Sequence, residues 1–152
     1  MNRVRTCKIP ESVLVVIYTR QLDVLMLERS DYKGFWQSVT GSKDTKDEPL
    51  LKTALREVKE ETGIAAKAAQ MRDWQLSNTY HIYPASQRYA PGVIRNTEHV
   101  FGLRVFEAGP VTISPREHVG WRRLSHRAAA DTCFSSSNVE AILLLPRFIG
   151  PL

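Results

Sequence analysis

The chain has 152 residues, of which 43% are hydrophobic, and it carries a formal net charge of +5. This length and apolar content predict a single domain over residues 1–152 with a core of its own. No apolar run approaches the length of a membrane span, and the run at 13–18 is too short for a signal-peptide core and follows an acidic residue. We therefore expect no membrane partner.

The basic residues are scattered along the chain, without an arginine-rich tail or a basic stripe of interleaved aromatic residues. This distribution disfavours a plain nucleic-acid binder, so we expect no stable nucleic-acid partner, although the charge permits a small anionic ligand. The two cysteines, Cys7 and Cys133, offer neither a disulfide framework nor a metal-ligand spacing. We expect both to be free thiols in a reducing compartment, the cytoplasm.

Hydrophobic periodicity and turn residues predict an α/β chain in which strands alternate with helices. In chain order, strands are expected at 12–19, 23–28 and 35–40, then a helix with Pro49 in its first turn and Gly63 at its end. Strands at 75–83, 98–106 and 119–124 follow, with residues 84–92 as a loop. A helix at 125–131 precedes a last helix, capped by Ser137 or Asn138, that ends near Leu145 before Pro146. These elements predict a mixed sheet flanked by helices.

The helix after Pro49 carries three carboxylates, Glu57, Glu60 and Glu61, at spacings that place them on one face. At about 100° per residue, Glu57 and Glu61 border the apolar arc and Glu60 lies just beyond Glu57. The arc itself is expected to hold Leu50, Leu51, Ala54, Leu55 and Val58. An acidic strip beside a buried arc is fixed against the body of the protein, as a site for a hard cation such as Mg²⁺ requires.

The alternative is a solvated helix with salt bridges between Glu and Lys four residues apart, the usual meaning of an acidic run. Here the residues four apart include like charges, at Lys52 and Arg56 and again at Glu57 and Glu61. Like charges at this spacing are destabilising on a free helix surface. The pattern therefore suits a binding site better than a salt-bridged surface.

The segment from Gly41 to Ile64 resembles the box of the Nudix hydrolases, a family acting on diphosphates linked to nucleosides and related groups. Every defined position from Arg56 to Ile64 matches that box, in the order Arg-Glu-apolar-X-Glu-Glu-X-Gly-apolar. The preceding loop has one residue more than the family pattern, so either Asp47 or Glu48 could stand for its first glutamate. The resemblance implies a Nudix-type α/β/α sandwich and a Mg²⁺-dependent hydrolase, with Mn²⁺ as a substitute.

Such an enzyme lowers the repulsion between phosphate oxygens and a nucleophile, because a divalent cation neutralises the phosphates and acidifies water. We expect Glu57 and Glu61 to bind the cation and Glu60 to be a third ligand or to orient water. Arg56 projects to the other side of the helix, and the resemblance implies that it holds a box glutamate in position.

Three further groups of segments, at 35–42, at 88–98 and at 117–118 with 137–138, resemble the folate-pathway branch of the Nudix family. That resemblance covers nearly the whole chain and implies hydrolysis of a small-molecule triphosphate, dihydroneopterin triphosphate, to the monophosphate and pyrophosphate. It implies three metal ligands, Glu57, Glu61 and Glu117. It also implies that these three residues, together with Glu60, are catalytic. It also implies substrate contacts at Lys8, Arg29, Thr40, Tyr80, His81, Ile82, Tyr83 and Ser135.

Other interpretations of the same residues stay open. The same chemistry could act on nucleoside triphosphates or on RNA 5′ ends, or the domain could sense a nucleotide without turnover. Lys8 and Arg29 could be ordinary surface charges, and Glu117 a solvated loop residue. The four histidines have no mutual metal spacing and are expected to be ordinary surface or core residues.

Overall fold

The structure is a computed structural model that describes residues 7–82, 88–106 and 109–149. Its elements are β1 (Glu11–Tyr18), β2 (Asp23–Arg29), β3 (Trp36–Gln37), β4 (Val39–Ser42), α1 (Leu50–Thr62), a 3₁₀ turn (Ala68–Gln70), β5 (Met71–His81), β6 (Arg95–Arg104), β7 (His118–Ser125), α2 (His126–Thr132) and α3 (Ser136–Phe148). In the described part of the chain, no helix combines the length and the apolar character needed to cross a membrane.

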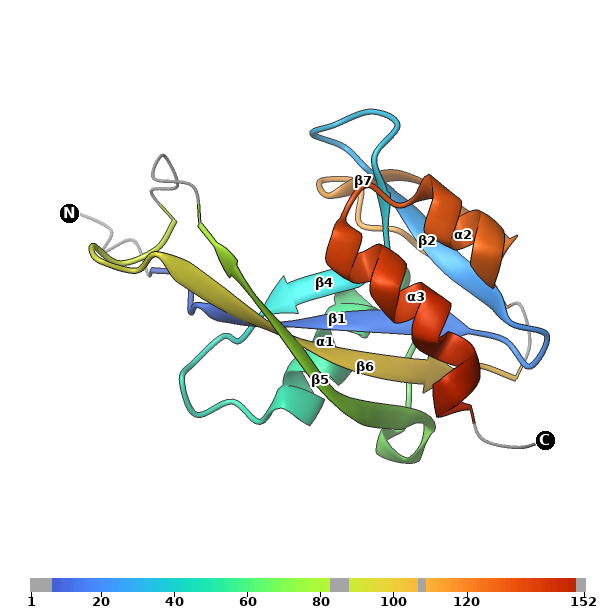
Figure 1. Ribbon diagram of the computed structural model, residues 1–152, viewed down its shortest axis with the longest axis horizontal. Coiled ribbons are helices and arrows are strands. Elements are labelled where there is room, and N and C mark those ends of the chain that lie inside the picture. The colour runs from blue at the N-terminus through green and yellow to red at the C-terminus, as the bar shows by residue number, and fades with distance from the viewer. Residues whose placement is uncertain (1–6, 83–87, 107–108, 150–152) are drawn as a thin grey trace.

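The sheet is mixed, and strand β1 lies at its centre. β1 runs parallel to β6 along its whole length, from Glu11 beside Thr97 to Tyr18 beside Arg104. On its other side β1 pairs with β2 only at Tyr18, and β4 takes the place of β2 along the first half of β1. Strand β2 continues instead with β3 and β7. The sheet therefore divides into two arms that diverge from the end of β1 (Figure 1).

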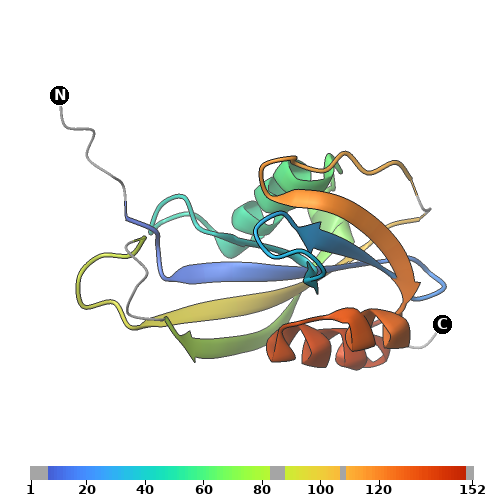
Figure 2. The same cartoon turned by 90° about the horizontal axis from the view of Figure 1, so that it is seen from above.

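Helices cover both faces of the sheet, with α1 on one side and α2 and α3 on the other (Figure 2). Alternating residues of β1 pack into two separate cores, as a strand buried on both faces requires. Val13, Val15 and Ile17 pack with Ala54 and Val58 of α1. On the opposite face, a second core holds Leu14, Val16 and Tyr18 with Ile142 and Leu145 of α3. The predicted α/β/α sandwich with a mixed sheet is confirmed.

Helix α1 ends as predicted, but its buried face is rotated relative to the prediction. Gly63 adopts a left-handed conformation (φ 75°) and its N–H caps the carbonyl of Lys59 at 2.9 Å. Pro49 is the residue before the helix rather than a member of its first turn. Leu51 is 38% exposed, whereas Thr53 is fully buried. The rotation turns Glu61 into the protein interior instead of leaving it at the border of the apolar arc.

Several predicted boundaries near α3 are wrong, and those at Ser38 and Asn138 follow from one contact. The strand predicted at 35–40 breaks at Ser38, whose N–H donates to Oδ1 of Asn138 (2.8 Å) while Nδ2 of Asn138 donates to Oγ of Ser38 (2.9 Å). Asn138 is therefore a buried member of α3, and neither it nor Ser137 caps the helix, which begins after Ser135. The helix also continues through Pro146 to Phe148 instead of ending near Leu145.

The strands of the β5–β6 arm are also shifted from their predicted positions. β5 begins at Met71, four residues earlier than expected, and contains an irregularity between Asp73 and Leu76. Gln75 takes a positive φ of 56° at this irregularity, which explains why the alternation of side chains is lost there. β6 spans Arg95–Arg104 rather than 98–106, so Asn96 belongs to the sheet.

Candidate active site

The divergence of the two sheet arms opens a cavity of about 1140 Å³. Its walls come from the segment before β1, from β1 and β4, from the ends of β2 and β5, from the starts of β6 and β7, from the last turns of α1 and from the beginning of α3. Residues that are far apart in sequence meet here, and eight of the predicted site residues line the cavity: Lys8, Arg29, Thr40, Glu57, Glu61, Tyr80, Glu117 and Ser135. The fold thus brings predicted metal ligands and predicted substrate-binding residues to one space.

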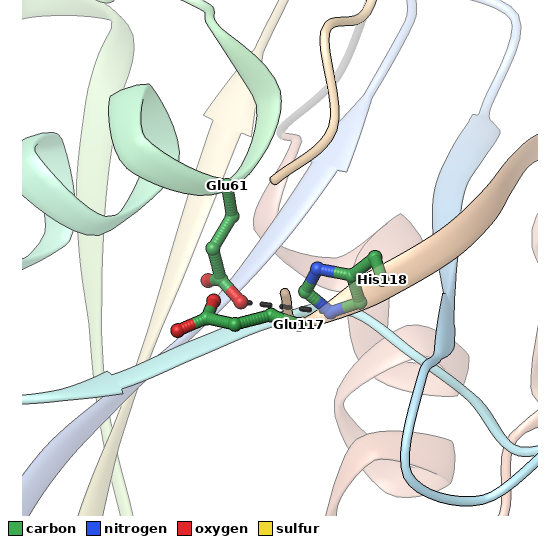
Figure 3. Close-up of side chains that lie close together, drawn as sticks. All are labelled: Glu61, Glu117 and His118. Atoms are coloured by element: carbon green, nitrogen blue, oxygen red, sulfur yellow. Dashed lines mark ion pairs between the residues drawn. The ribbon is translucent and has the colours of Figure 1, made fainter. Parts of the chain in front are cut away.

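Glu61 lies at the buried end of an acidic cluster in this cavity. Its side chain comes from the last turn of α1 and points toward Glu117 and His118, at the start of β7 (Figure 3). Each of the three residues offers one ligand atom within 4.8 Å of the others. Glu61 is 2% exposed, and its Oε2 has no hydrogen-bond partner in the described structure. A buried carboxylate oxygen without a donor fits a cation site.

Glu57 is placed beside this cluster by a glycine on β4. A Cβ atom on Gly41 would overlap the carboxylate carbon of Glu57. The glycine therefore leaves the space that the carboxylate occupies between α1 and β4, a close approach that no other residue type allows. The box glycine and the box glutamate are thus direct neighbours in space.

Arg56 binds the carboxylates around it. Its position on the helix had suggested instead that it projects away from them. Its guanidinium donates to both oxygens of Glu48, at 2.9 and 3.2 Å, and to Oε1 of Glu57 at 2.9 Å. It also donates to the carbonyl of Ser42 (2.9 Å) and reaches Glu60 at 3.4 Å. Arg56 therefore fixes the loop before α1 to the acidic face of the helix, which agrees with the predicted positioning role.

Glu48, and not Asp47, takes the place of the first box glutamate. Glu48 is buried and accepts a further hydrogen bond from Oγ1 of Thr53 (2.6 Å), whereas Asp47 is exposed. The hydrogen bonds from Arg56 lower the pKa of Glu48 to about 2. The additional loop residue therefore lies before Glu48, which keeps its contacts with Arg56 and Thr53.

The acidic cluster holds more negative charge than the surrounding protein compensates. Burial raises the pKa of Glu57 to about 7, with Glu60 adding to the effect. Burial, together with the neighbouring charges of Glu57 and Glu117, raises the pKa of Glu61 to about 10. Such shifts mean that full ionisation of the cluster needs a cation. The oxygen-rich donor set, with one carboxylate oxygen unpartnered, fits a hard divalent ion.

His118 is a member of this cluster that sequence reasoning missed, since all four histidines were expected to be ordinary. It is 2% exposed, its Nε2 lies 3.6 Å from Oε1 of Glu61, and its Nδ1 is unpartnered in the described structure. Burial and the charge of Arg29 lower the pKa of His118, which disfavours the charged imidazolium. The signal available in the sequence was its position next to Glu117.

Two basic predicted residues, Lys8 and Arg29, also line the cavity, and Arg29 lies beside His118 in the pairing of β2 with β7. Lys8 is held by a backbone hydrogen bond to the carbonyl of Arg88 (2.6 Å), with its ammonium over the ring of Tyr89. Burial and the charge of Arg88 lower the pKa of Lys8. Arg29 forms a bidentate ion pair with Asp31, Nε donating at 2.8 Å. Both side chains face the space in front of the acidic cluster and can supply positive charge to a phosphate chain.

The remaining predicted residues lie outside the cavity wall or outside the described chain. Glu60 is exposed on α1, where its contact is with Arg56. His81 is exposed at the end of β5, and the N–H of Ile82 donates to the carbonyl of Ile94 at 2.8 Å. Neither His81 nor Ile82 is among the lining residues, and Tyr83 lies outside the described residues. Their predicted substrate contacts stay predictions.

A comparison with protein families agrees with this geometry: residues 8–144 match the model of the NUDIX domain. The chain belongs to the Nudix family. The Nudix box is the segment 41–64, and the loop, Gly41 and α1 described above are its structural parts. The fold of a putative Nudix hydrolase from Listeria monocytogenes superposes with a TM-score of 0.76 at 21% identity, covering 93% of this chain and 94% of that one.

Nearer relatives of this Nudix protein share one name. The dihydroneopterin triphosphate diphosphatase of Escherichia coli (strain K12) is 42% identical over 139 residues, which is 89% of this chain and 91% of that protein. The protein of the same name from Haemophilus influenzae is 38% identical over 136 residues, covering 87% and 84%. The solved structure of the E. coli dihydroneopterin triphosphate pyrophosphohydrolase superposes with a TM-score of 0.80 at 41% identity, covering 94% and 97%.

Proposed function

We propose that this Nudix protein hydrolyses dihydroneopterin triphosphate to dihydroneopterin monophosphate and pyrophosphate with Mg²⁺ as cofactor. The observation that carries the proposal is the placement of Glu57, Glu61 and Glu117 in one cavity with Lys8 and Arg29. Acidic residues that suit a cation and basic residues that suit phosphates therefore occupy the same space. The names of the relatives, which match over most of the chain, support the choice of substrate.

In this proposal, different residues of the chain bind the cation, position its ligands and bind the phosphates. Glu57, Glu61 and Glu117 would hold Mg²⁺, which supplies charge neutralisation of the phosphates and a lowered pKa for water. Arg56 keeps Glu57 at the cavity wall through its 2.9 Å hydrogen bond. Lys8 and Arg29 would bind phosphate oxygens in the same cavity, Lys8 as a point charge and Arg29 as a planar guanidinium that exchanges its ion pair with Asp31 for the phosphate. The phosphate chain would thereby meet positive charge from Mg²⁺ and from two basic side chains in one cavity.

Glu60 has a separate place in the proposal. It lies on the exposed edge of α1, in contact with Arg56 and outside the cavity wall. We assign it to the orientation of water at the open side of the cation site, where an exposed carboxylate is reached by solvent. We assign Thr40 and Ser135, which also line the cavity, to substrate contact.

The proposal also covers the domain organisation of the protein and the compartment in which it works. We propose one domain over residues 1–152, supported by the family match over residues 8–144. We also propose that the protein works in the cytoplasm on a free small-molecule triphosphate. Cys7 and Cys133 are both free thiols in the structure, which supports a reducing compartment.

The test is phosphorus NMR of the purified protein with dihydroneopterin triphosphate and Mg²⁺. We expect pyrophosphate and the monophosphate to appear together, without earlier orthophosphate. Early orthophosphate would mean that a different bond is cleaved. Binding of the triphosphate without turnover would instead favour a sensing domain.

A further inference from the structure

A second polar cluster lies in the same cavity, away from the box glutamates, and the metal and phosphate chemistry does not use most of it. We name it the base-edge cluster; its members, all lining the cavity, are Ser12 of β1, Tyr80 of β5, Asn96 and Glu98 of β6, and Ser137 of α3. Glu98 is 6% exposed and Asn96 is 1% exposed. Buried polar groups of this kind are costly unless they are hydrogen-bonded, so their partners need to be accounted for.

Asn96 organises two hydroxyl groups. Its Nδ2 donates to Oγ of Ser12 and to Oη of Tyr80, both at 2.9 Å. Each hydroxyl oxygen accepts from Asn96, so neither proton is used in that bond, and a bond between the two hydroxyls uses only one of them. Oδ1 of Asn96 has no partner in the described structure. The cluster therefore offers a hydroxyl donor to a ligand, and the Oδ1 of Asn96 is an acceptor that still lacks a donor among the described residues.

Glu98 is the acceptor of the cluster. Within the described chain, its hydrogen bond comes from Oγ of Ser137, at 3.1 Å to Oε1. A carboxylate has about four acceptor positions, so one donor leaves most of them free. Burial raises the pKa of Glu98, which indicates that the protein alone does little to stabilise the charge. A structural role for a buried carboxylate would need more donors than Ser137 provides.

We propose that Glu98, with Tyr80 and Asn96, binds the 2-amino-4-oxopyrimidine edge that dihydropterins and guanine share. That edge presents a ring N–H and an exocyclic amine side by side, which a carboxylate accepts as a pair. Next to them it presents a carbonyl, which the hydroxyl of Tyr80 can donate to. The inference rests on the proposed function, since it assigns the group that recognises the substrate's ring.

The register of the sheet places the base-edge cluster at a suitable distance from the phosphate end. Glu98 lies beside Ser12 on the neighbouring strand, and Ser12 lies beside Ser42 on the next. With strands spaced by about 4.8 Å, roughly 10 Å of sheet separates Glu98 from Ser42. The carbonyl of Ser42 accepts from Arg56, so it marks the edge of the acidic cluster. Glu98 and the box residues Glu57 and Glu61 line one cavity of about 1140 Å³, so one ligand can reach both ends.

The experiment compares Glu98→Gln with the wild type on four triphosphates: dihydroneopterin triphosphate, dGTP, dITP, which lacks the 2-amino group, and dATP. Glutamine keeps the shape and the bond to Ser137 but offers one acceptor and one donor, the pattern that pairs with adenine. We expect kcat/KM to fall about 10- to 100-fold for dihydroneopterin triphosphate and dGTP, less for dITP, and to stay level or rise for dATP. The wild-type preference for dGTP over dITP should disappear in the variant.

A second variant and a control complete the design. Tyr80→Phe, at a half-exposed position that does not threaten folding, should reduce kcat/KM for the three oxo-substrates but not for dATP. Asp131→Asn removes an exposed carboxylate of α2 and should change none of the four values. Equal losses on all four substrates in Glu98→Gln, or no loss on any, would overturn the inference.

The outcomes separate this inference from the proposed function. If dihydroneopterin triphosphate is not hydrolysed but the order of dGTP, dITP and dATP shifts as expected, the proposed function fails and the base-edge cluster stands. If dihydroneopterin triphosphate is hydrolysed equally well by wild type and Glu98→Gln, the proposed function stands and the base-edge assignment fails.

Discussion

Arg56 donates two hydrogen bonds to Glu48, from Nε to Oε2 at 3.2 Å and from Nη2 to Oε1 at 2.9 Å. The pair joins the loop before α1 to the middle of that helix, and the same guanidinium also holds Glu57. Through Arg56, the position of a predicted metal ligand therefore depends on a glutamate that is not among the residues lining the cavity. This relationship explains why a lengthened loop does not disturb the site.

Glu48→Gln should therefore lower stability in a pH-dependent way. The pKa of Glu48 is lowered from 4.5 to about 2 in the folded protein, so its stabilising effect is present above pH 4.5 and is lost as pH falls toward 2. We expect the variant to lose roughly 2 kcal/mol of unfolding free energy at pH 7, typical of a hydrogen bond to a charged group. Urea unfolding at pH 7 and pH 3 measures the difference, which should shrink at pH 3. A loss that is equal at both pH values would show that the charge is not the cause.

Gly41→Ala should impair activity while leaving the fold intact. The new methyl group would overlap the carboxylate of Glu57, which can move because it ends a flexible side chain. A displacement of about 1 Å at such a position can cost on the order of 100-fold in rate. Steady-state kinetics and circular dichroism would separate the two effects. Gly109→Ala is a suitable control, since a methyl group there meets no atom within 4 Å; comparable losses in both variants would contradict the role of Gly41.

Helix α1 and its surroundings show which features of the site could be predicted from the sequence and which could not. The carboxylate spacing predicted an acidic face, and Gly63 predicted the end of the helix, because both are local properties. The depth of Glu61 was not predictable in this way, since it depends on how the helix rotates against β1 and β4. Glu117 could be linked to the box only by family resemblance, because chain reversal over more than fifty residues brings it there. The pairing of Ser38 with Asn138, 100 residues apart, left no local signal at all.

The metal-free protein should become less stable as pH rises, and Glu61→Gln should remove part of that effect. The pKa of Glu61 is raised from 4.5 to about 10 by burial and by Glu57 and Glu117, so the folded state favours the protonated form. Stability is then lost progressively as pH rises above 4.5 toward 10. In thermal melts with a chelator, we expect Glu61→Gln to melt above the wild type at pH 8 and close to it at pH 5.

Added Mg²⁺ should raise the melting temperature of the wild type above that of Glu61→Gln. A cation bound only by the folded state, at 100 times its dissociation constant, contributes about 2.7 kcal/mol, which corresponds to a melting-temperature increase of roughly 5–10 °C for a chain of this size. We expect that increase for the wild type and little of it for Glu61→Gln. An equal increase in both proteins would place the stabilising ion elsewhere.

The most direct measurement is a Mn²⁺ titration followed by electron paramagnetic resonance, on the wild type, Glu57→Gln, Glu61→Gln and the control Asp131→Asn, an exposed carboxylate of α2 outside the cavity wall. We expect the wild type and the control to bind Mn²⁺ alike, and both box variants to bind it far more weakly while turnover falls about 100-fold or more. Unchanged Mn²⁺ binding and unchanged turnover in both box variants would contradict the assignment of these carboxylates to the cation, and with it the catalytic account.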